Sequence, residues 1–131
     1  WNSGSKAGFT TGRPWLPLND EYPKLNVETE TEDENSVLNY YKNLIKLRKQ
    51  YPALIEGDYE ELLSYSPGIY AYARTTKDKS ERIIVIANTT AKIRGYKIPE
   101  LKGATLLAST YGNREATLLR SYEVRVYKVK I

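Results

Sequence analysis

The spacing of apolar residues changes once along the chain, and this change limits the possible folds more than any other feature. Between residues 37 and 51, apolar side chains recur at i, i+3, i+4 and i+7, the spacing of one helix face. These side chains are Val37, Tyr40, Tyr41, Leu44, Ile45 and Leu47 or Arg48. The pattern predicts one amphipathic helix, which Asp33, Asn35 or Ser36 can cap and which Pro52 ends at about Tyr51.

After Pro52 the apolar residues recur at every second position, which is typical of β-strands. Ile69, Ala71 and Ala73, for example, alternate with bulkier or more polar neighbours. The predicted strands cover residues 58–65, 69–74, 82–87, 92–98, 105–109, 116–119 and 122–129. Short strands at regular spacing with turns between them favour an antiparallel β-sandwich.

Two of these strands predict different environments. Residues 83–86 are Ile-Ile-Val-Ile, so strand 82–87 is apolar on both sides and is expected at the centre of a sheet, covered on each face. Strand 122–129 carries Glu123, Arg125 and Lys128, so it is expected to keep one face in water.

Residues 1–35 follow neither period and are rich in Gly, Pro, Thr and acidic residues, which predicts a long loop. Long unstructured connections are uncommon within compact domains, so this one is expected to lie against structure outside the chain. The chain begins at Trp1 and contains no methionine, and we therefore expect a piece of a longer polypeptide. The predicted fold class is mainly β, a C-terminal antiparallel β-sandwich preceded by a long loop and one amphipathic α-helix.

Composition excludes several kinds of chemistry. The chain has no cysteine and no histidine, so it has no disulfide, no thiol nucleophile and no imidazole base or ligand. The net charge is +4, and the cations of residues 36–131 are spread singly over the predicted helix and strands, which favours a solvated surface over a nucleic-acid site. No apolar run approaches the roughly 20 residues that a membrane-spanning helix needs. We expect no metal, no cofactor, no nucleic-acid partner and no membrane partner.

Three local patterns have simpler structural readings. The acidic run from Glu28 to Glu34 fits a solvated loop and helix start better than a calcium site or a catalytic pair, because neighbouring loop residues give no rigid frame. Asn88 begins a glycosylation sequon but also fits a strand end that enters a turn. The 12 tyrosines suit strand and helix faces, although two or three on one sheet face would form a sugar-binding platform.

The N-terminal residues resemble a known family of enzymes. Residues 1–19 read WNSGSKAGFTTGRPWLPLN, which is similar to the loop after the eighth barrel strand in glycoside hydrolase family 13. The resemblance is to its oligo-1,6-glucosidases, α-glucosidases, sucrose isomerases and trehalose-6-phosphate hydrolases. Residues 35–49 resemble the eighth barrel helix of that family, and residues 69–74, 84–88 and 122–127 resemble strands of its C-terminal all-β domain.

The resemblance implies a division into two parts. Residues 1–55 would be the terminal loop and last helix of a truncated (β/α)8 catalytic barrel, and residues 56–131 the all-β sandwich domain. Family members are retaining hydrolases whose three carboxylates lie upstream of the position of Trp1, so no catalytic residue is expected here. The implied partners are the chain's own upstream barrel and, through the parent enzyme, α-glucoside oligosaccharides in the cytoplasm.

The resemblance also implies weak candidates for substrate contact. The loop would lie at the mouth of the barrel, so Trp1, Phe9 and Thr10 would line the substrate entrance in the intact enzyme, with loop packing as the alternative. Asn2 departs from the acidic residue that is frequent in the family. The expected function is thus the non-catalytic C-terminal portion of an oligo-1,6-glucosidase-like enzyme, and the alternative is an independent carbohydrate-binding module.

Overall fold

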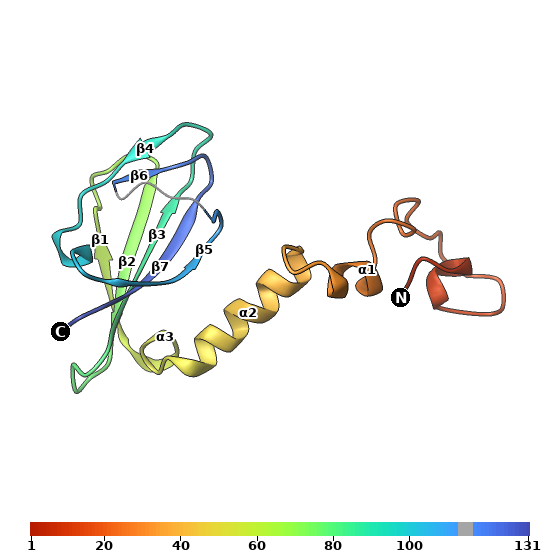
Figure 1. Cartoon of the computed structure of the whole chain (residues 1–131), viewed down its shortest axis with the longest axis horizontal. Coiled ribbons are helices and arrows are strands. Elements are labelled where there is room, and N and C mark those ends of the chain that lie inside the picture. Colours follow the sequence, from red (N-terminus) through yellow and green to blue (C-terminus); the bar gives the residue numbers. More distant parts are fainter. Residues whose placement is uncertain (113–116) are drawn as a thin grey trace. The chain divides into compact units, whose positions relative to one another are not determined.

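The computed structural model describes residues 1–112 and 117–131, and these form two compact units (Figure 1). The first unit is Trp1–Lys46 and the second is Leu47–Ile131, so the boundary falls inside one helix, α2 (Val37–Gln50). The predicted domain boundary after residue 55 stays a prediction. Each unit is described separately below.

The predicted loop 1–35 is only partly a loop. It contains a 3-10 turn, η1 (Ser5–Gly8), and a short helix, α1 (Val27–Glu32), which the apolar period did not indicate. A capping box starts α1: the Asn26 side chain accepts a hydrogen bond from the Thr29 N–H at 3.0 Å, and the Thr29 hydroxyl accepts one from the Asn26 N–H at 3.4 Å. Most of the acidic run is therefore helix, with Glu28 and Glu30 near its positive end.

The predicted amphipathic helix is confirmed as α2, and its ends have the expected causes. The Ser36 hydroxyl accepts a hydrogen bond from the Asn39 N–H at 3.1 Å, which caps the first turn. The helix ends at Gln50, and Pro52 then begins the short helix α3 (Ala53–Glu56). No residue of α2 is buried, although one of its faces is apolar.

The second unit is built on an antiparallel sheet of five strands in the order β1-β2-β3-β7-β5 (Figure 1). Its strands are β1 (Asp58–Leu62), β2 (Ile69–Thr75), β3 (Arg82–Asn88), β5 (Thr105–Ser109) and β7 (Val124–Val129). Two short strands, β4 (Arg94–Gly95) and β6 (Leu118–Leu119), form a second sheet, and η2 (Pro99–Leu101) follows β4. Strands 92–98 and 116–119 were predicted too long, and residue 116 lies outside the described residues. The mainly β, antiparallel character is confirmed; the sandwich and the barrel origin of α2 stay predictions.

The central position of β3 is confirmed, because it lies between β2 and β7 and its two faces contribute to two clusters. We call the face that carries Ala71, Ile84 and Ile86 the inner face; side chains from β6, η2 and the segment after β4 cover it. The outer face carries Ile83 and Val126 and is covered by side chains from residues 47–54. The sheet edges are β1, which is rich in carboxylates, and β5, whose pairing with β7 contains a register irregularity.

The prediction that strand 122–129 keeps one face in water was wrong. Glu123 and Arg125 are both 0% exposed; Arg125 lies on the side of β7 that faces the inner cluster, and Glu123 lies just before the strand and pairs with it. The burial is possible because the two side chains neutralise each other in an ion pair of 2.6 Å and because β7 lies between β3 and β5.

Candidate functional site

The three residues predicted to line a substrate entrance lie in one small loop of the first unit. The rings of Trp1 and Phe9 are 5.6 Å apart between centroids and tilted by 31°, and both are largely exposed. The Thr10 hydroxyl accepts a hydrogen bond from the Gly12 N–H at 3.0 Å, so this hydroxyl bonds within the loop itself. The structure thus brings Trp1 and Phe9 together, and a role for the three residues toward substrate stays a prediction.

Asn2 holds this loop in shape, a role that the sequence reading did not assign. Its side-chain oxygen accepts a hydrogen bond from the Gly4 N–H at 3.0 Å, and its backbone N–H donates to the Ala7 carbonyl at 3.1 Å. Gly8 has a φ of +71°, and a Cβ there would lie 2.8 Å from the Asn2 amide nitrogen. The loop therefore needs glycine at this position, and it presents the Trp1 and Phe9 rings on a fixed turn.

An apolar groove of about 420 Å³ lies in the same unit. Its lining is Trp1, Leu25, Asn26, Val27, Glu30, Val37 and Leu38. The polar members are already engaged, because the Asn26 amide donates to the Tyr22 carbonyl at 2.9 Å and the Glu30 carboxylate accepts from the Leu38 N–H at 3.3 Å. The groove suits an apolar side chain of another segment better than a sugar.

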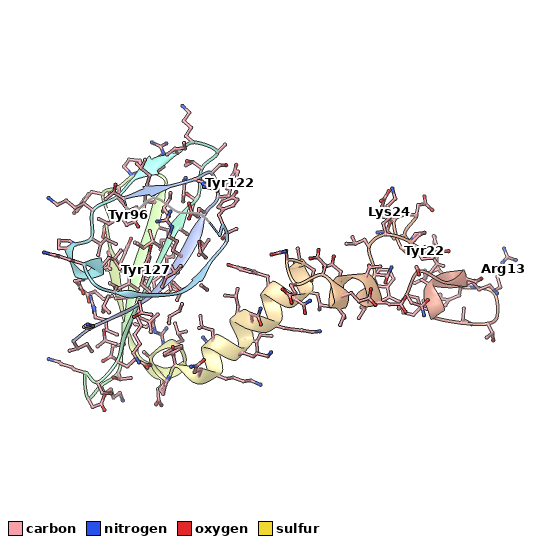
Figure 2. The ribbon with its side chains drawn as sticks, in the orientation of Figure 1. Arg13, Tyr22, Lys24, Tyr96, Tyr122 and Tyr127 are labelled. Carbon is pink, nitrogen blue, oxygen red and sulfur yellow. The ribbon has the colours of Figure 1, made fainter. Side chains whose placement is uncertain are left out.

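Several large side chains of this unit are exposed. Arg13, Tyr22 and Lys24 are labelled in Figure 2 on the N-terminal unit, and Trp15 is 90% exposed. A unit of this size with so many exposed large apolar side chains has the surface expected of a segment that packs against other protein.

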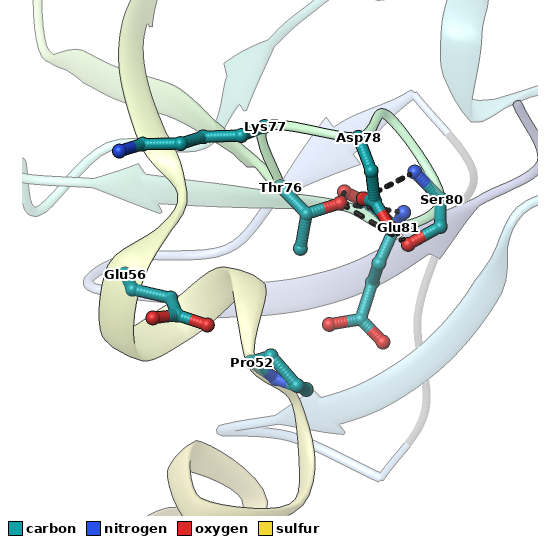
Figure 3. A pocket seen from close by; sticks show the side chains of 7 residues that line it. All are labelled: Pro52, Glu56, Thr76, Lys77, Asp78, Ser80 and Glu81. Carbon is teal, nitrogen blue, oxygen red and sulfur yellow. Dashed lines mark hydrogen bonds between the residues drawn. The ribbon is translucent and has the colours of Figure 1, made fainter.

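A polar pocket of about 480 Å³ lies beside the β2–β3 hairpin (Figure 3). Its lining is Pro52, Glu56, Thr76, Lys77, Asp78, Ser80 and Glu81. The Thr76 hydroxyl and the N–H and hydroxyl of Ser80 hydrogen-bond the Asp78 carboxylate and lower its pKa to about 2. Asp78 is therefore ionised at neutral pH and is no general acid.

A second carboxylate of this pocket, that of the half-buried Glu81, is also committed to structure. The Glu81 carboxylate accepts from the Ala53 N–H at 3.0 Å and from the Lys128 ammonium at 3.3 Å. It thereby ties the start of α3 to β3 and β7. The pocket thus contains no pair of carboxylates free to act across a glycosidic bond.

The most enclosed polar network of the second unit surrounds Arg125. Its Nε donates to Glu123 at 2.6 Å, and its two terminal nitrogens donate to the Leu118 carbonyl at 2.7 Å and the Tyr96 hydroxyl at 3.2 Å. The other oxygen of Glu123 accepts from the Arg120 N–H at 2.7 Å. These bonds join β7 to β6 and to the segment after β4.

The network shifts the pKa values of its members. Burial opposes the charged form of Glu123, but the hydrogen bonds from Arg125 and from the Arg120 N–H outweigh it and lower the pKa of this carboxyl. Burial likewise opposes the charge of Arg125, and the bond to Glu123 raises its pKa. Burial and a hydrogen bond with Tyr127 raise the pKa of Tyr96 to about 12 (both labelled in Figure 2). All members therefore keep one charge state near neutrality, which suits a structural network and not proton transfer.

Asn88 is the last residue of β3 and precedes a turn, as its structural interpretation predicted. The residue is buried; its amide donates to the Lys92 and Arg120 carbonyls, each at 2.7 Å, and its oxygen accepts from the Thr90 N–H at 3.0 Å. The side chain thus has no free nitrogen for a glycan in the folded chain.

Three tyrosines gather on the outer face of the sheet. The rings of Tyr59 and Tyr72 are 5.6 Å apart, as are those of Tyr70 and Tyr72, and the Tyr59 and Tyr70 hydroxyls hydrogen-bond each other at 3.1 Å. This bond raises the pKa of Tyr59 to about 12. Tyr127, by contrast, is buried in the core, as expected for a structural tyrosine.

Neither a metal cluster nor a membrane-spanning helix is found among the described residues. Across residues 1–112 and 117–131, no group of three or more acidic side chains is placed to hold a metal ion. Within the same described ranges, no helix is long and apolar enough to cross a membrane.

Comparison with known proteins gives consistent matches. Residues 1–57 match the family described as the alpha amylase catalytic domain. The chain is 41% identical, over its whole length, to 24% of the oligo-1,6-glucosidase of Parageobacillus thermoglucosidasius. It is 40% identical, over 79% of its length, to 18% of the trehalose-6-phosphate hydrolase of Escherichia coli K12.

Solved structures show the same relationship. The chain superposes on trehalose-6-phosphate hydrolase of Bacillus licheniformis with a TM-score of 0.84 and 32% identity, covering 98% of this chain and 24% of that one. For the isomaltulose synthase of Klebsiella sp. LX3 the TM-score is 0.83 and the identity 36%, covering 99% and 24%. The chain thus spans about a quarter of the length of the relatives that it matches.

Proposed function

We propose that this chain, whose residues 1–57 match the alpha amylase catalytic domain, belongs to that family of glycoside hydrolases and is the non-catalytic C-terminal portion of a retaining α-glucosidase of the oligo-1,6-glucosidase type. The parent enzyme would act on short α-glucosides with carboxylates that lie outside these 131 residues. The second unit would form a β-sandwich packed on a (β/α)8 barrel, to which residues 1–55 belong.

One observation carries the proposal: the match to the catalytic-domain family stops at residue 57, just before β1, while the relatives extend to about four times the chain's length. The enclosed carboxylates support it, because Glu81 and Glu123 each hold structural hydrogen bonds. The apolar surface of the first unit supports it as well, because such surface is expected where a segment packs against a larger body.

An activity comparison tests the proposal. The 131-residue chain and a polypeptide extended upstream to the length of the relatives would be assayed with an aryl α-glucoside. We expect hydrolysis only from the extended polypeptide. Turnover by the 131-residue chain, or a lack of α-glucosidase activity in the extended form, would contradict it. Isomaltose, maltose and trehalose 6-phosphate would then be compared as substrates of the extended form.

The alternative is an independent carbohydrate-binding module, and the tyrosines of the outer face are the observation in its favour. Tyr59, Tyr70 and Tyr72 form a contiguous aromatic surface on one sheet face. Their rings, however, are inclined by 30° and 45° to one another, which makes a poor flat platform for a sugar ring. Calorimetric titration of the chain with isomaltose, maltose and soluble starch would detect binding if the alternative holds.

A further inference from the structure

The two faces of the five-stranded sheet are covered to different extents. On the inner face Ala71, Ala73, Ile84 and Ile86 are fully buried under elements of the same unit. On the outer face the described cover is the segment 47–56, whose Leu47, Tyr51, Ala53 and Leu54 pack around Ile83 and Val126.

The tyrosine patch, defined here as Tyr59, Tyr70 and Tyr72, lies on this outer face. Tyr72 pairs with Val85 across the β2–β3 ladder, and Tyr59 pairs with Arg74 across the β1–β2 ladder. Because paired residues point to the same side of a sheet, the patch continues the surface that Ile83 begins. Tyr59 is 53% exposed and Tyr70 is 45% exposed, so large aromatic area remains in contact with solvent.

The chemistry of the patch fits a protein partner. Arg74 borders it and donates one long hydrogen bond, of 3.4 Å, to the Ile55 carbonyl. Its buried Nε has no hydrogen-bond partner among the described residues. Tyrosine and arginine are enriched at the centres of protein interfaces, where rings bury area while hydroxyl and guanidinium groups bond carbonyl or carboxylate acceptors.

The identity of the partner follows from what already covers this face. Residues 47–56 fall inside the match to the catalytic-domain family, which ends at residue 57. The cover over Ile83 is therefore made of catalytic-domain sequence, and the uncovered patch adjoins it through Arg74 and Ile55. We propose that the tyrosine patch is a docking surface for the remainder of the catalytic domain of the same polypeptide. This inference rests on the proposed function, since it requires that such a domain precede the chain.

A footprinting experiment tests the proposal directly. Hydroxyl-radical modification of Tyr70 would be measured in the 131-residue chain and in the polypeptide extended upstream to the length of the relatives. Burial of a half-exposed ring should slow its modification at least about tenfold in the extended form, because interface cores exclude water. Tyr65, which is 98% exposed and lies outside the patch, is the internal control and should react equally in both. Equal reactivity of Tyr70 in the two forms would overturn the proposal.

Matched substitutions give a second readout. We expect Tyr70→Lys to lower the thermal midpoint of the extended polypeptide by several degrees more than that of the 131-residue chain, and Tyr65→Lys to change neither. An equal effect of Tyr70→Lys in both would count against docking, as would sugar binding by the chain that Tyr70→Lys abolishes. The footprint does not depend on turnover, so an extended polypeptide that protects Tyr70 but hydrolyses no α-glucoside would refute the proposed function and leave the docking surface supported.

Discussion

Replacing Arg125 by methionine should destabilise the second unit more than any other single change on β7. Methionine keeps much of the side-chain volume, so the main effect on stability is the loss of the guanidinium charge and of its hydrogen bonds. Glu123 would keep its bond from the Arg120 N–H but lose its counter-ion, and at 0% exposure it cannot turn to water. The Leu118 carbonyl would lose its donor at the same time.

The size of the loss follows from this arrangement. Removing one partner of a buried ion pair costs about 3–5 kcal/mol, which is a large share of the roughly 5–15 kcal/mol that stabilises a typical domain. For a unit of this size, each kcal/mol shifts the melting temperature by about 4–8 °C, so a fall of at least about 12 °C is expected.

Urea unfolding of the chain, followed by circular dichroism, would measure the change. Arg120→Met is the matched control, because this exposed side chain lies 5.3 Å from the Tyr111 ring while its backbone N–H still bonds Glu123; it should cost less than about 1 kcal/mol. Adding Glu123→Gln to Arg125→Met should recover part of the lost stability, because it removes the buried carboxylate charge that has no counter-ion. The reasoning is refuted if Arg125→Met lowers the free energy of unfolding no more than Arg120→Met does. It is also refuted if the losses caused by Arg125→Met and Glu123→Gln simply add in the double variant.

Three further predictions concern the turns and loops of the second unit. Asn88→Asp removes the amide donor of two bonds and should lower the free energy of unfolding by about 2 kcal/mol or more in urea titration; a neutral result would mean that these bonds contribute little. Gly57→Ala places a Cβ 2.5 Å from the Ala53 carbonyl and should cost about 1–3 kcal/mol by thermal unfolding, whereas Gly112→Ala, whose Cβ meets no atom of the described residues within 4 Å, should be nearly neutral. The pKa of Asp78 is lowered from 3.8 to about 2, so its stabilising contribution is present above pH 3.8 and lost as the pH falls through 2; a carboxyl NMR titration with a midpoint near 3.8 would contradict this.

The spacing of apolar residues predicted the elements whose signal lies within the element itself. Strand β3 is a clear case, because four consecutive apolar residues can be buried only where both faces of a sheet are covered. Helix α2 is another, because its 3.6-residue period and Pro52 together define its extent. The resemblance of residues 1–19 to the enzyme loop is confirmed at the level of the family.

Periodicity failed where long-range partners decide the environment. Glu123 and Arg125 stand on the same side of β7 as Tyr127. Opposite charges two residues apart on one side of a strand can indicate a buried ion pair. The sequence analysis instead interpreted them as a solvent-exposed face. Helix α1 was missed because its apolar residues show no period, although Asn26 and Thr29 have the spacing of a capping box. The alternation of β2 places Tyr70 and Tyr72 on one face, but Tyr59 joins them only when β1 and β2 pair in their observed register, which no local signal marks.

The edge strands of the five-stranded sheet have a consequence for self-association. Strand β1 places Asp58, Glu60 and Glu61 along one edge of the sheet. The other edge strand, β5, contains the register irregularity between Leu106 and Ala108. A neighbouring molecule that tried to extend the ladder would meet repelling carboxylates on one side and a broken row of amide and carbonyl groups on the other. Fibrils grown by strand addition are thereby disfavoured, even when the protein is concentrated.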